Sequence, residues 1–378
     1  MARHQSVAPP RIARYVAVEI FTRQGLVAVD RRLQDFSCCV NLPEKLWIVK
    51  SRLPLLHFTR LSYIFCVRCF HFSRTAFMNS RPPFRALGIT ANFLGLEKEI
   101  SSYATSRIAV LPAPYEHTVS YGGGTRRGPQ AIIRASQYVE FYDEELDREL
   151  CAEMGIATVP PLRFGKSVHA GALGLISRSV GKLLADGKFV VTLGGEHTIS
   201  QASIRPHLEK YPDLSVVQFD AHSDLRESYQ KSKYSHASVM ARVCEYMDPR
   251  RITQVGIRAQ CIEESRYIRE RGVNTFYAHQ IRATPDWQDA VMKTLTDRVY
   301  VTFDVDGLDP SIMPSTGTPE PNGLLWSETM QLLRRIGEER TIVGCDVVEL
   351  APAKGVSHPD LTAAKLAYKL MNYAFPAQ

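Results

Sequence analysis

The chain has 378 residues, of which 45% are apolar and 22% are charged, a composition typical of a soluble globular protein that can bury a large core. Its net charge of +7 arises in residues 1–78, which carry 12 Lys and Arg against 4 Asp and Glu, whereas the remaining residues carry 34 against 35. A nearly neutral main body without a basic, aromatic-rich patch argues against nucleic acid as a partner.

The segment before about residue 80 shows no sustained helical or strand period. Its most apolar stretch, residues 53–70, is interrupted by His57, Arg60 and Arg68 and is therefore too short for a membrane span of about 20 apolar residues. No signal-peptide pattern is evident either. We therefore expect no membrane association and a cytoplasmic location.

Residues 1–80 are predicted to form a basic N-terminal extension outside the core, and residues 81–378 the functional domain. The extension is Arg-rich, as an organelle transit peptide would be, although its four acidic residues weaken that interpretation. Alternatively, it is upstream sequence translated from an early start codon, with Met78 as the true start. An organelle location follows only if the extension is a transit peptide.

The eight cysteines do not form a disulfide framework. Cys66 and Cys69 have the C-x-x-C spacing of a zinc site, but no second ligand pair lies nearby, so a metal role is disfavoured. The other six are Cys38, Cys39, Cys151, Cys244, Cys261 and Cys345.

After Ser106, short β-rich runs alternate with amphipathic helical stretches. The predicted strands are residues 108–111, 189–193, 214–219, 252–257, 298–303 and 341–348. The predicted helices are residues 171–185, 236–245, 261–272, 287–295, 327–336 and 360–373. This alternation predicts a single three-layer α/β domain with a mainly parallel sheet and helices on both faces. The glycines at 122–124 match no phosphate-loop pattern, and Pro129 suits the first turn of a helix, so they are interpreted as a turn and helix cap.

Metal-ligand side chains follow several predicted strands, at the edge where open parallel sheets bind ligands. The segments are Gly194-Gly-Glu-His197-Thr, Asp220-Ala-His222-Ser-Asp224, Asp304-Val-Asp306-Gly-Leu-Asp309-Pro and Asp346-Val-Val-Glu349. Residues two apart in extended backbone point to one side, so the carboxylates and imidazoles can converge.

Two imidazoles and four carboxylates are too many ligands for one tetrahedral ion. His197, Asp220, His222, Asp224, Asp304 and Asp306 therefore predict two ions. Oxygen-dominated ligation without thiolate favours Mn²⁺ over structural zinc. Two divalent cations would also offset the four negative charges, which would otherwise repel one another.

These motifs, in this order, resemble the ureohydrolase family of arginases and agmatinases over residues 107–375, and the likeness implies an arginase-like fold. The resemblance implies that His197, Asp220, Asp224 and Asp304 hold one Mn²⁺, and Asp220, His222, Asp304 and Asp306 the other. It further implies that Glu349 pairs with a guanidinium group, that Asp224 relays a proton and that His236 shuttles one to the leaving amine. Metal binding can lower the pKa of water from about 15.7 to about 7, which provides the nucleophile.

The last strand and the loop through His236 look more like bacterial agmatinases than arginases, so agmatine, cleaved to putrescine and urea, is the expected substrate. Arginases place an Asn where Arg226 stands, to hold the amino-acid end of arginine. A cationic tail would nevertheless face Arg226 unless Glu227 or another acid neutralises it. N1-aminopropylagmatine, guanidinobutyrate and arginine remain candidate substrates. A one-zinc deacetylase of the same fold and a non-catalytic metal-binding oligomer are less favoured functions, and the resemblance suggests a homotrimer or homohexamer.

Removing residues 1–77, so that the chain starts at Met78, should leave folding and activity nearly unchanged, because the charge imbalance and the cysteine cluster end there. Thermal unfolding and turnover of the truncated and full-length proteins would test this boundary. Loss of soluble, active protein on truncation would contradict it.

Overall fold

The computed structural model describes residues 15–22, 25–32, 36–42, 46–51 and 84–376. The chain divides into two compact units, residues 1–74 and 75–378. In the first unit, β1 (Tyr15–Thr22) pairs antiparallel with β2 (Gly25–Arg32), and β3 (Phe36–Leu42) with β4 (Leu46–Ser51). The expectation of no strand pattern before residue 80 was wrong in these segments, where β-branched residues such as Val16, Val18 and Ile20 recur at every second position. Cys66 and Cys69 lie outside the described residues.

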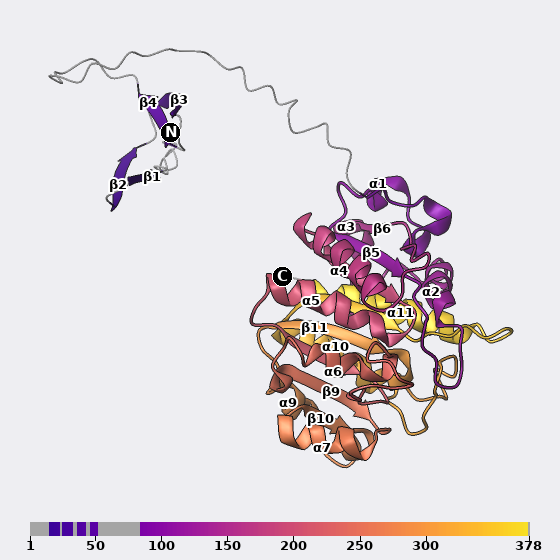
Figure 1. The fold of residues 1–378 in the computed structure, drawn as a ribbon. Coiled ribbons are helices and arrows are strands. Elements are labelled where there is room, and N and C mark those ends of the chain that lie inside the picture. Colours follow the sequence, from indigo (N-terminus) through magenta and orange to yellow (C-terminus); the bar gives the residue numbers. More distant parts are fainter. Residues whose placement is uncertain (1–14, 23–24, 33–35, 43–45, 52–83, 377–378) are drawn as a thin grey trace, which may run out of the picture. The chain divides into compact units, whose positions relative to one another are not determined.

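The second unit contains an eight-stranded sheet in which all strands are parallel (Figure 1). The strands are β5 (Ile108–Ala113), β6 (Ile156–Thr158), β7 (Phe189–Gly194), β8 (Ser215–Phe219), β9 (Ile252–Ile257), β10 (Asn274–Tyr277), β11 (Arg298–Asp304) and β12 (Thr341–Val348). Their order in the sheet is β10-β9-β8-β11-β12-β7-β5-β6. The predicted parallel sheet is confirmed.

Helices cover both faces of this sheet, as parallel strands require. One face packs against α2 (Gly128–Ser136), α9 (Trp287–Met292), α10 (Trp326–Glu339) and α11 (His358–Ala374); the other packs against α4 (His169–Ala185), α5 (Ser200–Lys210), α6 (Val239–Val243) and α7 (Ile262–Arg271). The short helices are α1 (Lys98–Ser101), α3 (Leu150–Met154) and α8 (Ala278–Ile281). Strand residues alternate between the two cores: Ile108 and Val110 face the first, and Ala109 and Leu111 the second. The three-layer α/β domain is confirmed.

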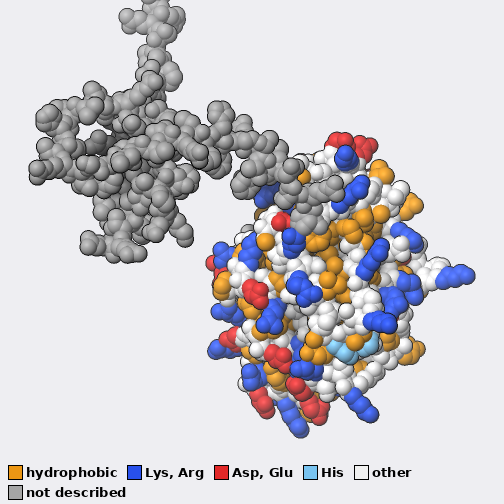
Figure 2. All heavy atoms as spheres, turned by 45° about the horizontal axis from the view of Figure 1, so that its top comes forward, with side chains coloured by type: hydrophobic (Ala, Val, Ile, Leu, Met, Phe, Trp, Pro, Cys, Tyr) orange, Lys and Arg blue, Asp and Glu red, His pale blue; other side chains and the backbone are white. Residues whose placement is uncertain are grey.

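None of the described helices is long and apolar enough to cross a membrane. On the face drawn in Figure 2, Lys and Arg side chains are spread over the surface, and Asp and Glu side chains lie mainly at the top and toward the lower left.

A buried cation fastens α11 to the loop after α2. The Lys369 side chain is 4% exposed, and its Nζ lies 2.7 Å from both Asp143 Oδ1 and Glu145 Oε2. Burial opposes the charged form of Lys369, but hydrogen bonds to these two carboxylates outweigh it and raise its pKa above the ordinary value. Glu145 also accepts a hydrogen bond from Tyr373. Removing the cation would therefore leave carboxylates without their counter-ion, and that of Asp143 is fully buried.

Replacing Lys369 with Ala should lower the free energy of unfolding by about 3 kcal/mol, because one partner of a buried ion pair is lost. Lys365→Ala is the matched control on the same helix, since the Lys365 ammonium is partly exposed and lies 3.9 Å from Glu144. The control should change stability by less than about 1 kcal/mol. Equal urea midpoints for the two variants would contradict the role of Lys369.

Candidate metal centre and cavity

The candidate site lies at the carboxyl ends of four strands that are neighbours in the sheet, in the order β8-β11-β12-β7. The loop after β7 carries His197, and the loop after β8 carries Asp220, His222 and Asp224. Strand β11 ends at Asp304, with Asp306 in the 3₁₀ turn that follows, and Glu349 comes directly after β12. Segments up to 152 residues apart in the sequence therefore meet at one edge.

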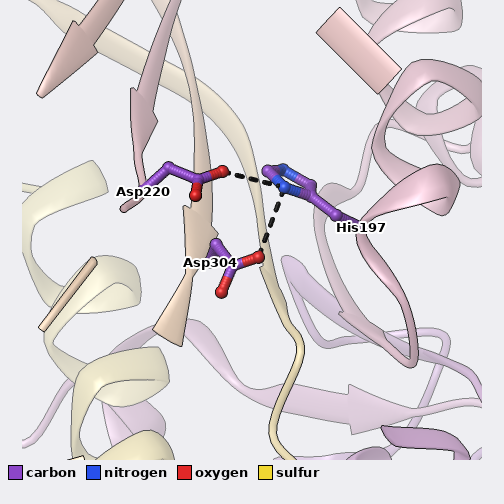
Figure 3. A group of neighbouring side chains, drawn as sticks. All are labelled: His197, Asp220 and Asp304. Atoms are coloured by element: carbon purple, nitrogen blue, oxygen red, sulfur yellow. Dashed lines mark ion pairs between the residues drawn. The ribbon is translucent and has the colours of Figure 1, made fainter. Parts of the chain in front are cut away.

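Three carboxylates converge on one imidazole nitrogen. His197 Nδ1 lies 3.0 Å from an oxygen of Asp220, 3.1 Å from Asp224 and 3.4 Å from Asp304. Figure 3 shows the His197 ring pointing toward Asp220 and Asp304. The nitrogen is buried and makes no hydrogen bond of normal geometry. Nitrogen and oxygen atoms that converge in this way suit a cation, and His197, Asp220 and Asp304 are close enough to share one.

A second group of ligands shares Asp220 with the first. His222 Nδ1 lies 2.9 Å from Asp306 Oδ2 and 3.7 Å from Asp220 Oδ1, and the three residues could hold a second ion. The structure thus brings all six predicted ligands together, with the Asp220 carboxylate common to both groups.

Neighbouring donors fix the carboxylates. Asp220 accepts hydrogen bonds from Gln218 Nε2 at 2.7 Å and from the backbone N–H of His222 at 2.6 Å. Asp306 accepts the N–H of Ala221, and Asp304 accepts the N–H of Asp306. On the far side of the His197 ring, Nε2 lies 3.0 Å from the hydroxyl of Thr302. The ring and carboxylates are therefore oriented by the protein itself.

The charge balance of the cluster favours a divalent metal. Burial alone would lower the pKa of His222, yet the Asp306 and Asp220 carboxylates raise it to about 12. Burial and the neighbouring carboxylates raise the pKa of Asp304 well above its usual range, and burial and Asp220 raise that of Asp224 to about 7. These groups hold protons because four carboxylates are crowded together. Divalent cations would offset the negative charge of the carboxylates better than protons do. The residues therefore fit a two-ion centre of nitrogen and oxygen ligands.

The loops of the site meet at Gly195. Its N–H donates to Ala113 O at 3.1 Å, and its carbonyl accepts the N–H of Glu349 at 2.8 Å. A Cβ at this position would collide with the carbonyl of Tyr115, so only glycine allows the loop after β5 to approach.

Glu349 has an unusual backbone conformation. Its φ is 64°, and its carboxylate accepts the N–H of His197 at 2.6 Å. Asp224 also has a positive φ, of 53°. Non-glycine residues with such φ values are strained and concentrate at functional sites, which fits both positions.

A cavity of about 450 Å³ opens over the cluster. It is lined by Asp224, Asp304, Asp306, His222, Glu349 and His236, and also by Arg226, Arg258, Gln260, Glu264, Glu320 and the loop after β5. The predicted proton-transfer residues Asp224 and His236 and the predicted guanidinium partner Glu349 therefore line the same cavity as the candidate metal ligands.

Arg226 on this wall lies near Glu264, not near Glu227. The Glu264 carboxylate is 3.8 Å from the Arg226 guanidinium, which also lies over the Tyr229 ring at 5.3 Å. Glu227 instead pairs with Arg242 at 2.8 Å. Glu264, which is 3% exposed, is thus the acid that offsets the charge of Arg226.

Residues 106–373 match the model described as the arginase family. Over 286 residues, the chain is 41% identical to an N(1)-aminopropylagmatine ureohydrolase of Synechocystis sp., which covers 74% of this chain and 92% of that protein. It is also 37% identical over 268 residues to an agmatinase of Bacillus anthracis, covering 70% of this chain and 90% of the relative. A solved structure of agmatine ureohydrolase from Thermoplasma volcanium superposes with a TM-score of 0.68 at 29% identity, covering 75% of this chain and 94% of that one.

Proposed function

The chain belongs to the arginase family, and we propose that it is a ureohydrolase that cleaves the guanidinium group of agmatine to putrescine and urea. The observation that carries this proposal is the convergence of His197, Asp220, His222, Asp224, Asp304 and Asp306 below a cavity that Glu349 and His236 also line. Its relatives with the names agmatinase and N(1)-aminopropylagmatine ureohydrolase support the reaction class.

The first ion would be held by His197, Asp220, Asp224 and Asp304, and the second by Asp220, His222, Asp304 and Asp306. The donor set of carboxylates and imidazoles supports Mn²⁺ for both. Two divalent cations bound here would lower the pKa of a water molecule, so that a nucleophile is available at neutral pH.

The protein's own groups bind the substrate and move the proton. Glu349 can pair with a planar guanidinium through its carboxylate, and its strained position at the end of β12 aims it from the sheet into the cavity. Asp224 can accept the proton that the nucleophile loses. His236, on the cavity wall, can donate a proton from a ring nitrogen to the departing amine nitrogen.

Three further properties of the protein remain predictions: assembly as a homotrimer or homohexamer, a cytoplasmic location, and the role of residues 1–80.

Metal analysis tests the two-ion centre. The purified protein should carry about two Mn²⁺ per chain, and chelation should abolish urea release and lower the melting temperature, because an ion that binds the folded state stabilises it. Asp220→Asn should lose most of both ions, since that carboxylate belongs to both groups. Asp213→Asn is the control, because Asp213 pairs with Arg298 at the surface. One tightly held zinc per chain would refute the two-ion proposal.

The tail of the substrate decides which guanidino compound is preferred, because Glu349 and the nucleophile treat every guanidinium alike. The Arg226–Glu264 pair offsets the cation on the wall, which supports a cationic tail. A substrate whose α-carboxylate has no partner in the cavity would bind in the transition state less favourably by at least about 2 kcal/mol, because the carboxylate loses its water. N1-aminopropylagmatine is the second candidate substrate, favoured by the 41% identity to the Synechocystis relative.

Urea release should therefore be highest with agmatine or N1-aminopropylagmatine and low with arginine, guanidinobutyrate and guanidinopropionate. The kcat/KM for arginine should be at least about 30-fold lower than that for agmatine, because burying the unpaired α-carboxylate costs at least about 2 kcal/mol. Arg226→Ala should not reverse this ranking, and Arg205→Ala, at an exposed position on α5, is the control. A preference for arginine that disappears in Arg226→Ala would show that Arg226 binds a carboxylate and that the substrate is a guanidino acid.

A further inference from the structure

Two hydroxyl groups hold the imidazole of His236. Thr118 Oγ1 lies 2.8 Å from Nδ1, and Ser120 Oγ lies 2.7 Å from Nε2. Thr118 Oγ1 also accepts the backbone N–H of His236 at 3.2 Å. Both hydroxyls belong to the loop after β5, which is more than 110 residues away in the sequence. Both ring nitrogens therefore have a partner within the cavity wall.

The chemistry of these partners suits a group that changes protonation state. A neutral imidazole has one N–H donor and one acceptor nitrogen, whereas the imidazolium has two donors. A hydroxyl can donate or accept by rotating its hydrogen, which a carboxylate or an ammonium group cannot do. Thr118 and Ser120 can therefore hydrogen-bond either state of the ring without moving it.

The loop that carries the two hydroxyls is itself held in place by carboxylates. Glu196, which is 1% exposed, accepts the backbone N–H groups of His117 at 2.7 Å and Thr118 at 2.5 Å. Glu116 accepts the N–H groups of Gly124, Thr125 and Arg126 at the other end of the loop. Glu196 adjoins His197, so the position of the hydroxyls is tied to the metal centre.

We propose that Thr118 and Ser120 are positioning residues that keep the His236 ring in one orientation through both of its protonation states. A leaving amine in the cavity takes the place of Ser120 Oγ at Nε2, so that the Nε2–H proton passes to the amine and the ring is left neutral. The Tyr229 ring, which meets the imidazole edge-on at a centroid distance of 5.9 Å, packs against it from the loop after β8. The expected effect on kinetics rests on the proposed ureohydrolase function. The expected orientation of the ring rests on the hydrogen bonds alone.

Steady-state kinetics test the kinetic consequence. Thr118→Val and Ser120→Ala should each lower kcat for agmatine by about 5- to 10-fold, the effect of one lost hydrogen bond, while KM, metal content and melting temperature change little. Thr118→Ser should restore most of kcat because it keeps the hydroxyl. Thr362→Val is the matched control, since Thr362 is a partly exposed residue of α11 whose hydroxyl bonds within its own helix. A kcat within twofold of wild type in both Thr118→Val and Ser120→Ala would overturn the proposal.

A double-substitution cycle separates an effect through His236 from a general effect on the loop. In a His236→Asn background, Thr118→Val should slow the reaction by less than about twofold, because the ring that it positions is absent. An undiminished effect would overturn the proposal. If His236→Asn releases no measurable urea, the contrast between Thr118→Val and Thr118→Ser decides.

Spectroscopy tests the ring orientation without any turnover. In protein with ¹⁵N-labelled histidine that is loaded with diamagnetic Zn²⁺ in place of paramagnetic Mn²⁺, the His236 ring signals are those lost in His236→Asn. Thr118→Val should shift them, and Thr362→Val should not. Unshifted signals in Thr118→Val would refute the inference even in an active enzyme. Shifted signals in a protein that releases no urea from any guanidino compound would instead support the positioning and refute the proposed function.

Discussion

The concentration of four carboxylates at one edge of the sheet is the constraint on which the rest of the site depends. Asp220, Asp224, Asp304 and Asp306 are all at least nine-tenths buried, and no arrangement of the two imidazoles alone neutralises them. Burying unpaired charge costs several kcal/mol for each group, so this set of carboxylates favours the binding of cations. The hydrogen bonds from backbone N–H groups hold the carboxylates apart in defined directions and prepare the site for those cations.

Strand order explains how these ligands meet. Strands β8, β11, β12 and β7 are adjacent in the sheet although they are far apart in the chain, because helical crossovers place β11 and β12 between β8 and β7. The carboxyl ends of β7, β8 and β11 therefore supply the candidate metal ligands, and the end of β12 supplies the Glu349 carboxylate. The loop after β5 completes the wall, since Gly195 lets it lie against the end of β7. The cavity is thus a direct consequence of parallel topology.

The fold and the convergence of the candidate metal ligands could be predicted because their signals are local: apolar β-rich runs followed by short acidic motifs. Strand β6, which has three residues, and helix α5, whose Pro206 breaks the usual helix pattern, were not predicted. Helix α2 was not predicted either, although Pro129 lies in its first turn, as expected. The partners of His236 could not be predicted, because Thr118 and Ser120 are ordinary polar residues whose role depends on a contact across more than 110 positions.

Charge pairing on the cavity wall, which bears on the substrate, also depends on contacts that the sequence does not reveal. The sequence places Glu227 beside Arg226, but neighbouring residues diverge, and the Glu227 side chain turns to Arg242. Glu264, at the start of α7, reaches Arg226 instead and also accepts the N–H groups of Leu225 and Cys261. Arg258, the other cation on the wall, donates to the backbone carbonyls of Asp306 and Glu320. The cavity wall thus carries Glu264 and Glu320 beside Arg226 and Arg258, and this pairing depends on contacts between segments that are not neighbours in the sequence.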